Sequence, residues 1–274
     1  MSAPGVVVFS PSQYSLYSLA VVERFLGAGV EVRGICVRRL LSGQRLREEY
    51  RQEGSQLPRK IWKKMLRRGT RPPGTETSGS RNLRALARDH GIPVIFCQTL
   101  NDLDVLDHLE KHAASLVVFT GGGILRRPIL ERAGRGVLNC HLGFLPDYRG
   151  MDASWWAVLE GQPDKLGLSV HLMDEGIDTG PILSVRPLPL EITDTSFERL
   201  QERHESLMGE MMVETCLKFL RGEIQPQPQR AEEGKQYFRM HPRLREIAEK
   251  KLAPYVRSSV APRDGGRRPR LRVS

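Results

Sequence analysis

Asn139 and His141 could share a reaction centre, because they lie two positions apart in the apolar run "GVLNCH" at 136–141. Alternate residues of a strand face the same side, so the amide and the imidazole would project together. An amide can donate a hydrogen bond to a developing oxyanion, and an imidazole with a reference pKa of about 6.5 can exchange a proton near neutral pH. The pair therefore suits group transfer, although a polar turn at a strand end would explain the same two residues.

Several carboxylates follow a second expected strand. The segment "LSVHLMDEGIDTGPIL" at 168–183 alternates as a strand and then forms a polar turn that holds Asp174, Glu175 and Asp178. If this strand neighbours 136–141 at the carboxyl edge of a sheet, a carboxylate joins the amide and the imidazole. Such a set suits acyl transfer to an amine, since the carboxylate can orient the imidazole or accept the proton that the nucleophile loses.

Two other interpretations of these residues stay open. His141, His171 and Asp178 could ligate zinc, but no H-x-x-x-H or comparable spacing favours a metal, and we expect none. Asp178 and Thr179 could instead form only a turn before a glycine and a proline. Spacing alone does not choose among these alternatives.

The elements that must position these residues alternate along the chain. Apolar runs predict strands at 5–9, 30–38, 93–97, 115–120 and 136–141, and helical patterns separate them, one after a capping box at Ser10 and others at 81–90, 102–112 and 126–133. This alternation predicts an α/β fold with a Rossmann-like, mostly parallel twisted sheet and helices on both faces. Ligands of such sheets bind beyond the carboxyl ends of the strands.

A glycine-rich segment, "TGGGIL" at 120–125, follows one of the strands. It is not a dinucleotide or phosphate fingerprint, because G-x-G-x-x-G and G-x-x-x-x-G-K-[ST] are both missing after the first strand. Three consecutive glycines indicate that the backbone closely approaches either a ligand or a neighbouring helix. The sequence favours these two explanations equally.

The chain divides into three predicted parts. Residues 1–222 form a catalytic domain that ends with a helix from Thr195, with Thr195 and Glu198 as its capping box, and that carries a basic helical insertion at about 40–80. Residues 223–256 form a short extension with a terminal helix. Residues 257–274 are rich in Arg, Pro and Gly and are expected to form a disordered basic tail.

The positive charge is concentrated in two segments. Of the net charge of +10, residues 38–71 contribute +9 through twelve Lys or Arg and three acids, and residues 257–274 contribute +5 through six Arg and one acid. The remaining chain is therefore mildly acidic. The two basic segments would permit a nucleic-acid partner, but a solvated amphipathic helix and a solvated tail are the favoured explanation.

The cysteines and the hydropathy indicate the cellular setting. Cys36, Cys97, Cys140 and Cys216 lie far apart without a C-x-x-C pair, which argues against a disulfide framework. The sequence contains no apolar run of the roughly 20 residues that a membrane span requires. We therefore expect a cytoplasmic protein.

Two segments together resemble a known family. "GVLNCHLGFLPDYRG" and "GLSVHLMDEGIDTGPIL" are similar to the signature motifs of the folate-dependent formyltransferases, which include glycinamide ribonucleotide, methionyl-tRNA and sugar-amine formyltransferases. The resemblance covers roughly residues 5–220. It implies that Asn139, His141 and Asp178 are the catalytic trio and that 10-formyltetrahydrofolate is the formyl donor.

The resemblance also implies where the donor binds and how the reaction proceeds. The donor's pterin would contact Gly121, Gly122, Gly123 and Ile124 in one loop and Asp174 and Glu175 in the other. An acceptor amine would attack the formyl carbon while the amide and the imidazole stabilise the oxyanion. The carboxylate would hold the imidazole and help to carry protons.

Two residues depart from the family pattern. Gly143 stands where the family commonly has Ser, and Asp152 stands in a loop that is more often apolar. The first strand is followed by "SPSQYSL" rather than a phosphate loop, which disfavours glycinamide ribonucleotide as acceptor. The short extension disfavours initiator tRNA without excluding it. We therefore expect a small primary amine, with a nucleotide-linked amino sugar as the closest family precedent.

Two further functions remain as alternatives. A formyltetrahydrofolate hydrolase would use the same trio with water as the nucleophile. A non-catalytic nucleic-acid-binding protein on this fold would explain the basic segments, and its binding would weaken steeply with salt. The sequence does not indicate the oligomeric state.

Overall fold

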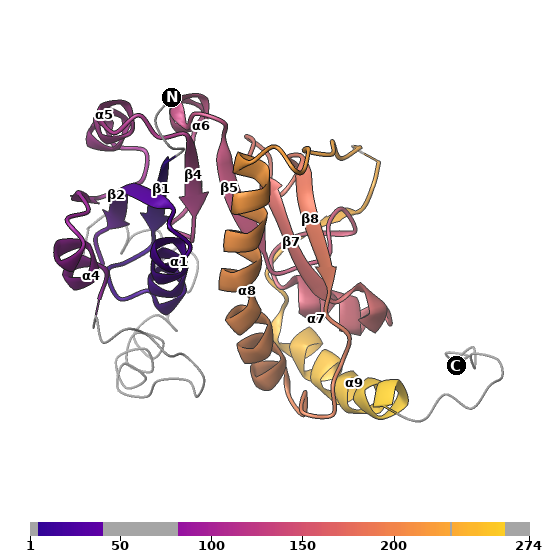
Figure 1. Ribbon diagram of the computed structural model, residues 1–274. Helices are drawn as coiled ribbons and strands as arrows, with labels where there is room; N and C mark the ends of the chain where they lie inside the picture. Colours follow the sequence, from indigo (N-terminus) through magenta and orange to yellow (C-terminus); the bar gives the residue numbers. More distant parts are fainter. Residues whose placement is uncertain (1–4, 41–81, 231, 261–274) are drawn as a thin grey trace.

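The central feature is one seven-stranded sheet in the order β3-β2-β1-β4-β5-β7-β8 (Figure 1). The computed structural model describes residues 5–40, 82–230 and 232–260. The strands are β1 (Gly5–Ser10), β2 (Glu31–Arg38), β3 (Val94–Cys97), β4 (Leu116–Phe119), β5 (Val137–His141), β7 (Gly167–Leu172) and β8 (Ile182–Pro187). The first five are parallel, whereas β7 and β8 are antiparallel to their neighbours.

Helices cover both faces of this sheet, as the alternating pattern predicts. Val6 and Val8 face a core that includes α1 (Leu16–Gly27), α4 (Leu83–Asp89) and α8 (Phe197–Leu220). Val7 and Phe9 face a second core with α5 (Leu103–Lys111) and α6 (Arg127–Arg132). Because β1 is buried on both faces, its sequence is a continuous apolar run rather than an alternating one.

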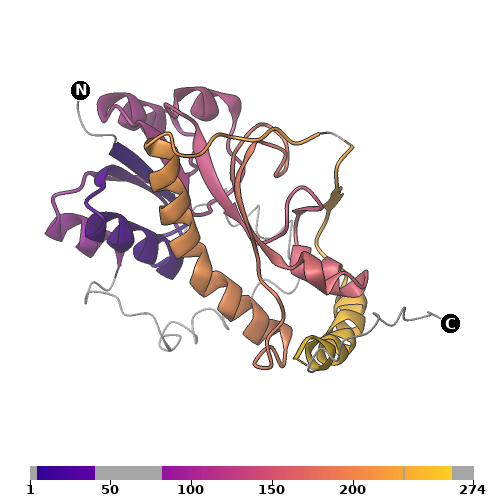
Figure 2. The same ribbon diagram turned by 45° about the vertical axis from the view of Figure 1, so that its right-hand side comes forward.

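A third core joins the C-terminal elements to the rest of the chain. It packs α7 (Ala153–Leu159) against α9 (Pro242–Val260) and the first turn of α8. Nearby, β6 (Tyr148–Gly150) pairs in parallel with β9 (Lys235–Tyr237), and a short 3-10 helix spans Pro163–Lys165. Figure 2 shows α9 beside α7, at the end of α8 that lies far from β4 and β5.

Two of the predicted helix caps are wrong, by five positions for α1 and by one position for α8. Ser15 caps α1 by accepting a hydrogen bond from the Ser18 amide, whereas Ser10 is buried and bonds the Ser18 hydroxyl at 2.7 Å. Ser196, rather than Thr195, caps α8. In both cases several Ser or Thr residues stand close together, and the backbone conformation that selects the cap depends on tertiary packing.

The extension contains the expected terminal helix, preceded by the short strand β9. Helix α9 continues to Val260 and so includes the first residues of the predicted tail, because Val256 is buried and the Ser259 hydroxyl bonds backbone. The predicted basic helix at about 40–80 and the tail beyond residue 260 lie outside the described residues.

The cysteines and the hydropathy of the helices are two further properties of this fold. Cys36, Cys97, Cys140 and Cys216 are all buried and free. Among the described residues, no helix combines the length and apolar character that crossing a membrane would require.

Candidate active site

Asn139 and His171 lie directly opposite each other on the antiparallel strands β5 and β7. Opposite residues of such a pair project to the same face and approach closely. The Asn139 Nδ2 and His171 Nε2 atoms are accordingly 3.1 Å apart. His141, two residues further along β5, lies opposite Ser169 and is also buried. The strand register therefore places one amide and two imidazoles at the end of β5.

Asp178 reaches this group from the loop between β7 and β8. Its Oδ2 lies 3.3 Å from His141 Nδ1, and its Oδ1 lies 3.3 Å from His171 Nε2. The Gly150 amide donates to Oδ2 over 2.9 Å. Asp178 has a φ of 53°, a conformation that is uncommon outside glycine and often found at functional sites. The structure thus brings Asn139, His141 and Asp178 together, and adds His171.

The electrostatics of this group favour an ionised carboxylate. Burial alone would raise the pKa of Asp178, but the hydrogen bond from His171 and the charges of His141 and His171 lower it to about 2. Burial lowers the pKa of His141, although the nearby Asp178 opposes this shift. At neutral pH the site therefore contains a carboxylate beside a His141 imidazole for which burial favours the neutral form.

Gly143 has a structural role that explains its departure from the family pattern. His141 Nε2 lies 2.9 Å from the Tyr148 carbonyl oxygen. A Cβ added at Gly143 would lie only 2.3 Å from that same nitrogen and 2.8 Å from the Ala153 Cβ. Any side chain at position 143 would therefore compete with the present position of the imidazole.

The glycine-rich loop packs closely against its neighbours. Gly121, Gly122 and Gly123 all have φ between 113° and 127°, which disfavours other residues. A Cβ at Gly122 would lie 2.7 Å from a Leu100 methyl group, and Arg38 donates to the Gly122 carbonyl over 3.1 Å. Packing within the protein therefore explains why position 122 is a glycine. Ile124, in contrast, is 74% exposed. Donor binding by this loop remains a prediction.

The two acidic residues that precede Asp178 differ in their contacts. The Asp174 carboxylate accepts hydrogen bonds from the Gly176 amide at 3.1 Å and from the Thr179 hydroxyl at 2.7 Å. It therefore shapes the loop that carries Asp178. Glu175 is exposed at the tip of this loop. Contact of Asp174 and Glu175 with the folate donor remains a prediction.

The support of Asp178 includes residues that the sequence does not reveal. The Gln229 side-chain amide donates to the carbonyl oxygens of Asp178 at 2.9 Å and Gly180 at 2.6 Å. Its own oxygen accepts a hydrogen bond from Arg149. Nothing in the local sequence distinguishes Gln229 from its neighbours. The sequence did contain a signal for His171, because this residue lies in the second motif and in the strand that the alternating pattern predicts.

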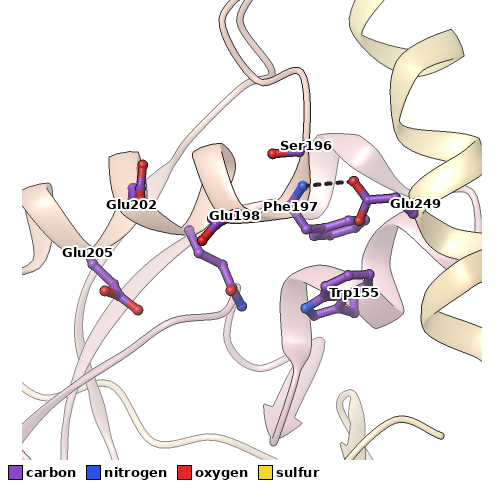
Figure 3. Close-up of a pocket in the computed structure, with 8 residues that line it drawn as sticks. Trp155, Ser196, Phe197, Glu198, Glu202, Glu205 and Glu249 are labelled. Carbon is purple, nitrogen blue, oxygen red and sulfur yellow. Dashed lines mark hydrogen bonds between the residues drawn. The ribbon is translucent and has the colours of Figure 1, made fainter. Parts of the chain in front are cut away.

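A separate pocket of about 430 Å³ lies between α7, α8 and α9 (Figure 3). The Trp155 ring stacks on Phe197 with centroids 3.6 Å apart, and Glu249 accepts a hydrogen bond from the Phe197 amide. Four glutamates lie in its lining: Glu198, Glu202, Glu205 and Glu249. None of the predicted site residues lines this pocket.

The described residues also bear on the zinc alternative. His141, His171 and Asp178 do converge, but within the ranges that the structure describes no group of three or more His, Cys, Asp or Glu is arranged to hold a metal ion. Asp178 uses both oxygens on imidazoles and a backbone amide. This arrangement suits proton transfer and orientation of the imidazoles.

Comparison with known proteins finds formyl transferases that are similar to this chain. The sequence profile described as Formyl transferase matches residues 85–216, which include Asn139, His141, His171 and Asp178. This match spans 132 of the chain's 274 residues. A methionyl-tRNA formyltransferase from Synechococcus sp. strain JA-2-3B'a(2-13) is 41% identical over 148 residues, which cover 53% of this chain and 45% of that protein. The chain thus spans about half the length of the curated formyl transferases that it matches.

Solved formyl transferases share the fold at low sequence identity. Glycinamide ribonucleotide transformylase 1 from Symbiobacterium toebii superposes with a TM-score of 0.57 at 16% identity, covering 83% of this chain and 96% of that one. An N-formyltransferase from Helicobacter canadensis, in complex with folinic acid and dTDP-3-aminofucose, superposes with a TM-score of 0.55 at 16% identity, covering 85% and 70%. The Rossmann-like fold predicted from the strand pattern is therefore confirmed.

Proposed function

We propose that this chain transfers a formyl group from 10-formyltetrahydrofolate to the primary amine of an acceptor. The observation that carries the proposal is the position of Asp178, which contacts His141 on β5 and His171 on β7, beside Asn139. The formyl transferase profile and the folinic acid bound to the H. canadensis neighbour support a folate donor. Bound 10-formyltetrahydrofolate would supply an activated formyl carbon.

The residues of the site fit this donor and the steps of the reaction. Asn139 is partly exposed and can donate a hydrogen bond to an oxyanion, while the buried His141 and Asp178 can move or hold a proton. The attacking amine forms the new C–N bond and loses a proton, and the bond to the donor nitrogen breaks as that nitrogen gains one. Asp178 is ionised at neutral pH and is therefore able to accept a proton through a water.

The acceptor is the finer part of the proposal. A small primary amine, such as a nucleotide-linked amino sugar, is the first candidate, and the dTDP-3-aminofucose of the H. canadensis neighbour supports it. Methionyl-tRNA is the second candidate, because the curated relatives at 41% and 33% identity are methionyl-tRNA formyltransferases. In both cases the nucleophile is an amine that must be unprotonated. Turnover should therefore rise with pH through the pKa of that amine.

The test separates donor binding from chemistry. The protein is first titrated with 5-formyltetrahydrofolate, a stable analogue, by calorimetry at two salt concentrations. Saturable, salt-insensitive binding supports the donor half, and each amine is then assayed for a mass gain of one formyl group. His141→Ala and Asp178→Ala should nearly abolish this gain. Full activity in Asp178→Ala would show that the assigned trio is wrong.

The same experiment distinguishes the alternatives. A formyltetrahydrofolate hydrolase would release formate without any acceptor. A nucleic-acid-binding protein would bind RNA or DNA with an affinity that falls steeply with salt, because neutralised phosphates release counterions. We further propose that residues 1–222 are the catalytic unit and that 223–256 supports its site, since Gln229 contacts the backbone of Asp178.

A further inference from the structure

Asp178 is contacted by a side chain that lies beyond the matched range of residues 85–216. Its φ of 53° falls in the left-handed region, where residues other than glycine persist only when the surrounding contacts impose it. The Gln229 side-chain amide donates to the carbonyl oxygen of Asp178 at 2.9 Å and to that of Gly180 at 2.6 Å. One side chain therefore fixes the backbone on both sides of Thr179.

The contacts of Gln229 determine the orientation of its amide. The carbonyl oxygens of Asp178 and Gly180 only accept hydrogen bonds, so the NH2 group of Gln229 must face them. Its oxygen, Oε1, accepts a hydrogen bond from Arg149 Nε at 3.2 Å. Turning the amide by 180° would place its oxygen against two carbonyl oxygens and its NH2 group against the guanidinium. The observed orientation satisfies all three hydrogen bonds, and Arg149 stabilises it.

Arg149 is itself fixed within the protein. Its side chain is buried, and its NH2 group donates to the Arg230 carbonyl oxygen at 3.1 Å. Arg149 lies on β6 directly before Gly150, whose amide donates to Asp178 Oδ2 at 2.9 Å. A buried charged group is costly unless it keeps its hydrogen bonds. The Arg149–Gln229 pair therefore ties β6 to the loop that carries Asp178.

The segment that carries Gln229 is anchored beside β8 by its backbone. The Ile182 amide donates to the Gln227 carbonyl oxygen at 2.8 Å, and the Gln227 amide donates to the Ile182 carbonyl oxygen at 2.7 Å. Gln229 follows two residues later. Its side chain thus reaches the loop between β7 and β8 from a backbone that is held independently of that side chain.

The backbone at position 178 sets the direction of the carboxylate. Oδ2 lies 3.3 Å from His141 Nδ1 and accepts from the Gly150 amide, while Oδ1 lies 3.3 Å from His171 Nε2. The two oxygens thus serve imidazoles on different strands. A change of the Asp178 backbone would move both oxygens together, because they are carried on the same Cα–Cβ bond.

We propose that Gln229, oriented by Arg149, is a positioning residue that holds Asp178 with one carboxylate oxygen toward each imidazole. The importance of this position for catalysis rests on the proposed formyl transfer. The position itself does not, because it follows from contacts within the protein. The extension at 223–256 thereby supplies part of the support of the catalytic carboxylate.

The first experiment measures the position of the carboxylate by hydrogen exchange. The Gly150 amide donates to Asp178, whereas the Met151 amide donates to the Tyr237 carbonyl oxygen at 3.0 Å. In the ¹⁵N-labelled full chain, both amides should be protected from exchange. Gln229→Met should speed exchange at Gly150 by roughly tenfold or more and leave Met151 unchanged, because only the bond to the carboxylate is lost.

Two variants calibrate this measurement. Asp178→Ala removes the acceptor and gives the exchange rate of an unbonded Gly150 amide. Gln225→Met changes an exposed side chain of the same segment and should leave the exchange unaltered. Unchanged protection of Gly150 in Gln229→Met would overturn the proposal. Equal losses of protection at Gly150 and Met151 would also overturn it, since they would indicate a general loosening of β6.

The second experiment measures kinetics in variants that thermal unfolding shows to be folded. Gln229→Glu keeps the size of the side chain and an acceptor for Arg149, but its carboxylate cannot donate to the two carbonyl oxygens. Gln229→Glu and Gln229→Met should each lower kcat by up to about 10²-fold, the effect of misplacing a reacting group by about 1 Å. The KM values should change by no more than about twofold, because binding of donor and acceptor is retained.

Arg149→Met tests whether the pair acts as a unit. It should lower kcat less than Gln229→Met does, because the two carbonyl oxygens still orient the amide. Combining the two substitutions should cause no further loss, since residues of one hydrogen-bond network are not additive. Fully additive losses would contradict a shared role.

The kinetics and the exchange distinguish a failure of this proposal from a failure of the proposed function. An unchanged kcat in Gln229→Met, or a raised KM with kcat unchanged, would contradict a positioning role. A wild type that binds no folate and modifies no amine would contradict the proposed function. In that case the exchange of the Gly150 amide still decides whether Gln229 holds the Asp178 carboxylate in place.

Discussion

The Arg245 guanidinium donates a hydrogen bond to Asp152 Oδ2 over 2.5 Å and thereby connects helix α9 to the loop beside the site. The same carboxylate oxygen accepts from the Met240 amide at 2.8 Å. Two residues before Asp152, the Gly150 amide donates to Asp178. The departure from the family pattern at position 152 is thus the point where the C-terminal extension supports the loop that contacts Asp178.

Replacing Arg245 with Met should loosen this support. Asp152 has a φ of 57° and would lose its charged partner while remaining mostly buried. We expect a loss of about 1–2 kcal/mol in the free energy of unfolding, because a hydrogen bond to a charged group contributes roughly 1.5–3 kcal/mol and the partial exposure of Arg245 weakens it, together with a severalfold decrease in kcat. Urea unfolding and initial rates check this. Arg243→Met, on an exposed side chain of the same helix, is the control, and equal effects of both variants would contradict the prediction.

Replacing Gly143 with Ala should displace the His141 imidazole. The new Cβ would lie 2.3 Å from His141 Nε2, so the ring must leave the Tyr148 carbonyl. Overpacking of this kind costs about 1–3 kcal/mol, and a misplacement of the ring near 1 Å can lower kcat by up to about 10²-fold. Gly27→Ala is the matched control, because no atom lies within 4 Å of its added Cβ. A Gly143→Ala variant with unchanged kcat would show that the imidazole position is not important for the reaction.

Two buried histidines outside the site should make the fold sensitive to acid. Burial lowers the pKa of both His108 and His204 to about 4, and His108 Nε2 and both ring nitrogens of His204 have no hydrogen-bond partner. The unfolded chain therefore binds more protons than the folded chain between about pH 6.5 and 4. Stability is fully present above this window and is lost as the pH falls through it, by at most about 1.4 kcal/mol per pH unit for each histidine.

Urea unfolding at pH 7, 5.5 and 4.5 measures this slope. The double variant His108→Gln, His204→Gln should flatten it, because the glutamines do not titrate. His90→Gln removes an exposed histidine and should leave the slope unchanged. A wild type whose stability does not fall between pH 6.5 and 4 would refute the assignment of these two histidines as buried and neutral.

The sequence by itself determined the sheet and the shared face of Asn139 and His141. Strands β1 and β4 are nearly continuous apolar runs, because parallel strands are buried on both faces, and such runs are recognisable without any knowledge of tertiary contacts. The two-residue period of a strand is equally local. It places the amide and the imidazole on one side, and the motifs around them indicate the family.

Only the tertiary structure decided how these residues are combined. The antiparallel register of β7 on β5 brings His171 opposite Asn139, although 32 positions separate them in the sequence. The contact of Arg245 with Asp152 spans 93 positions. Pairings of this kind depend on which strands and helices become neighbours and on small backbone choices, such as the positive φ of Asp178. Local periodicity carries no information about them, because their free energy comes from contacts that exist only in the folded chain.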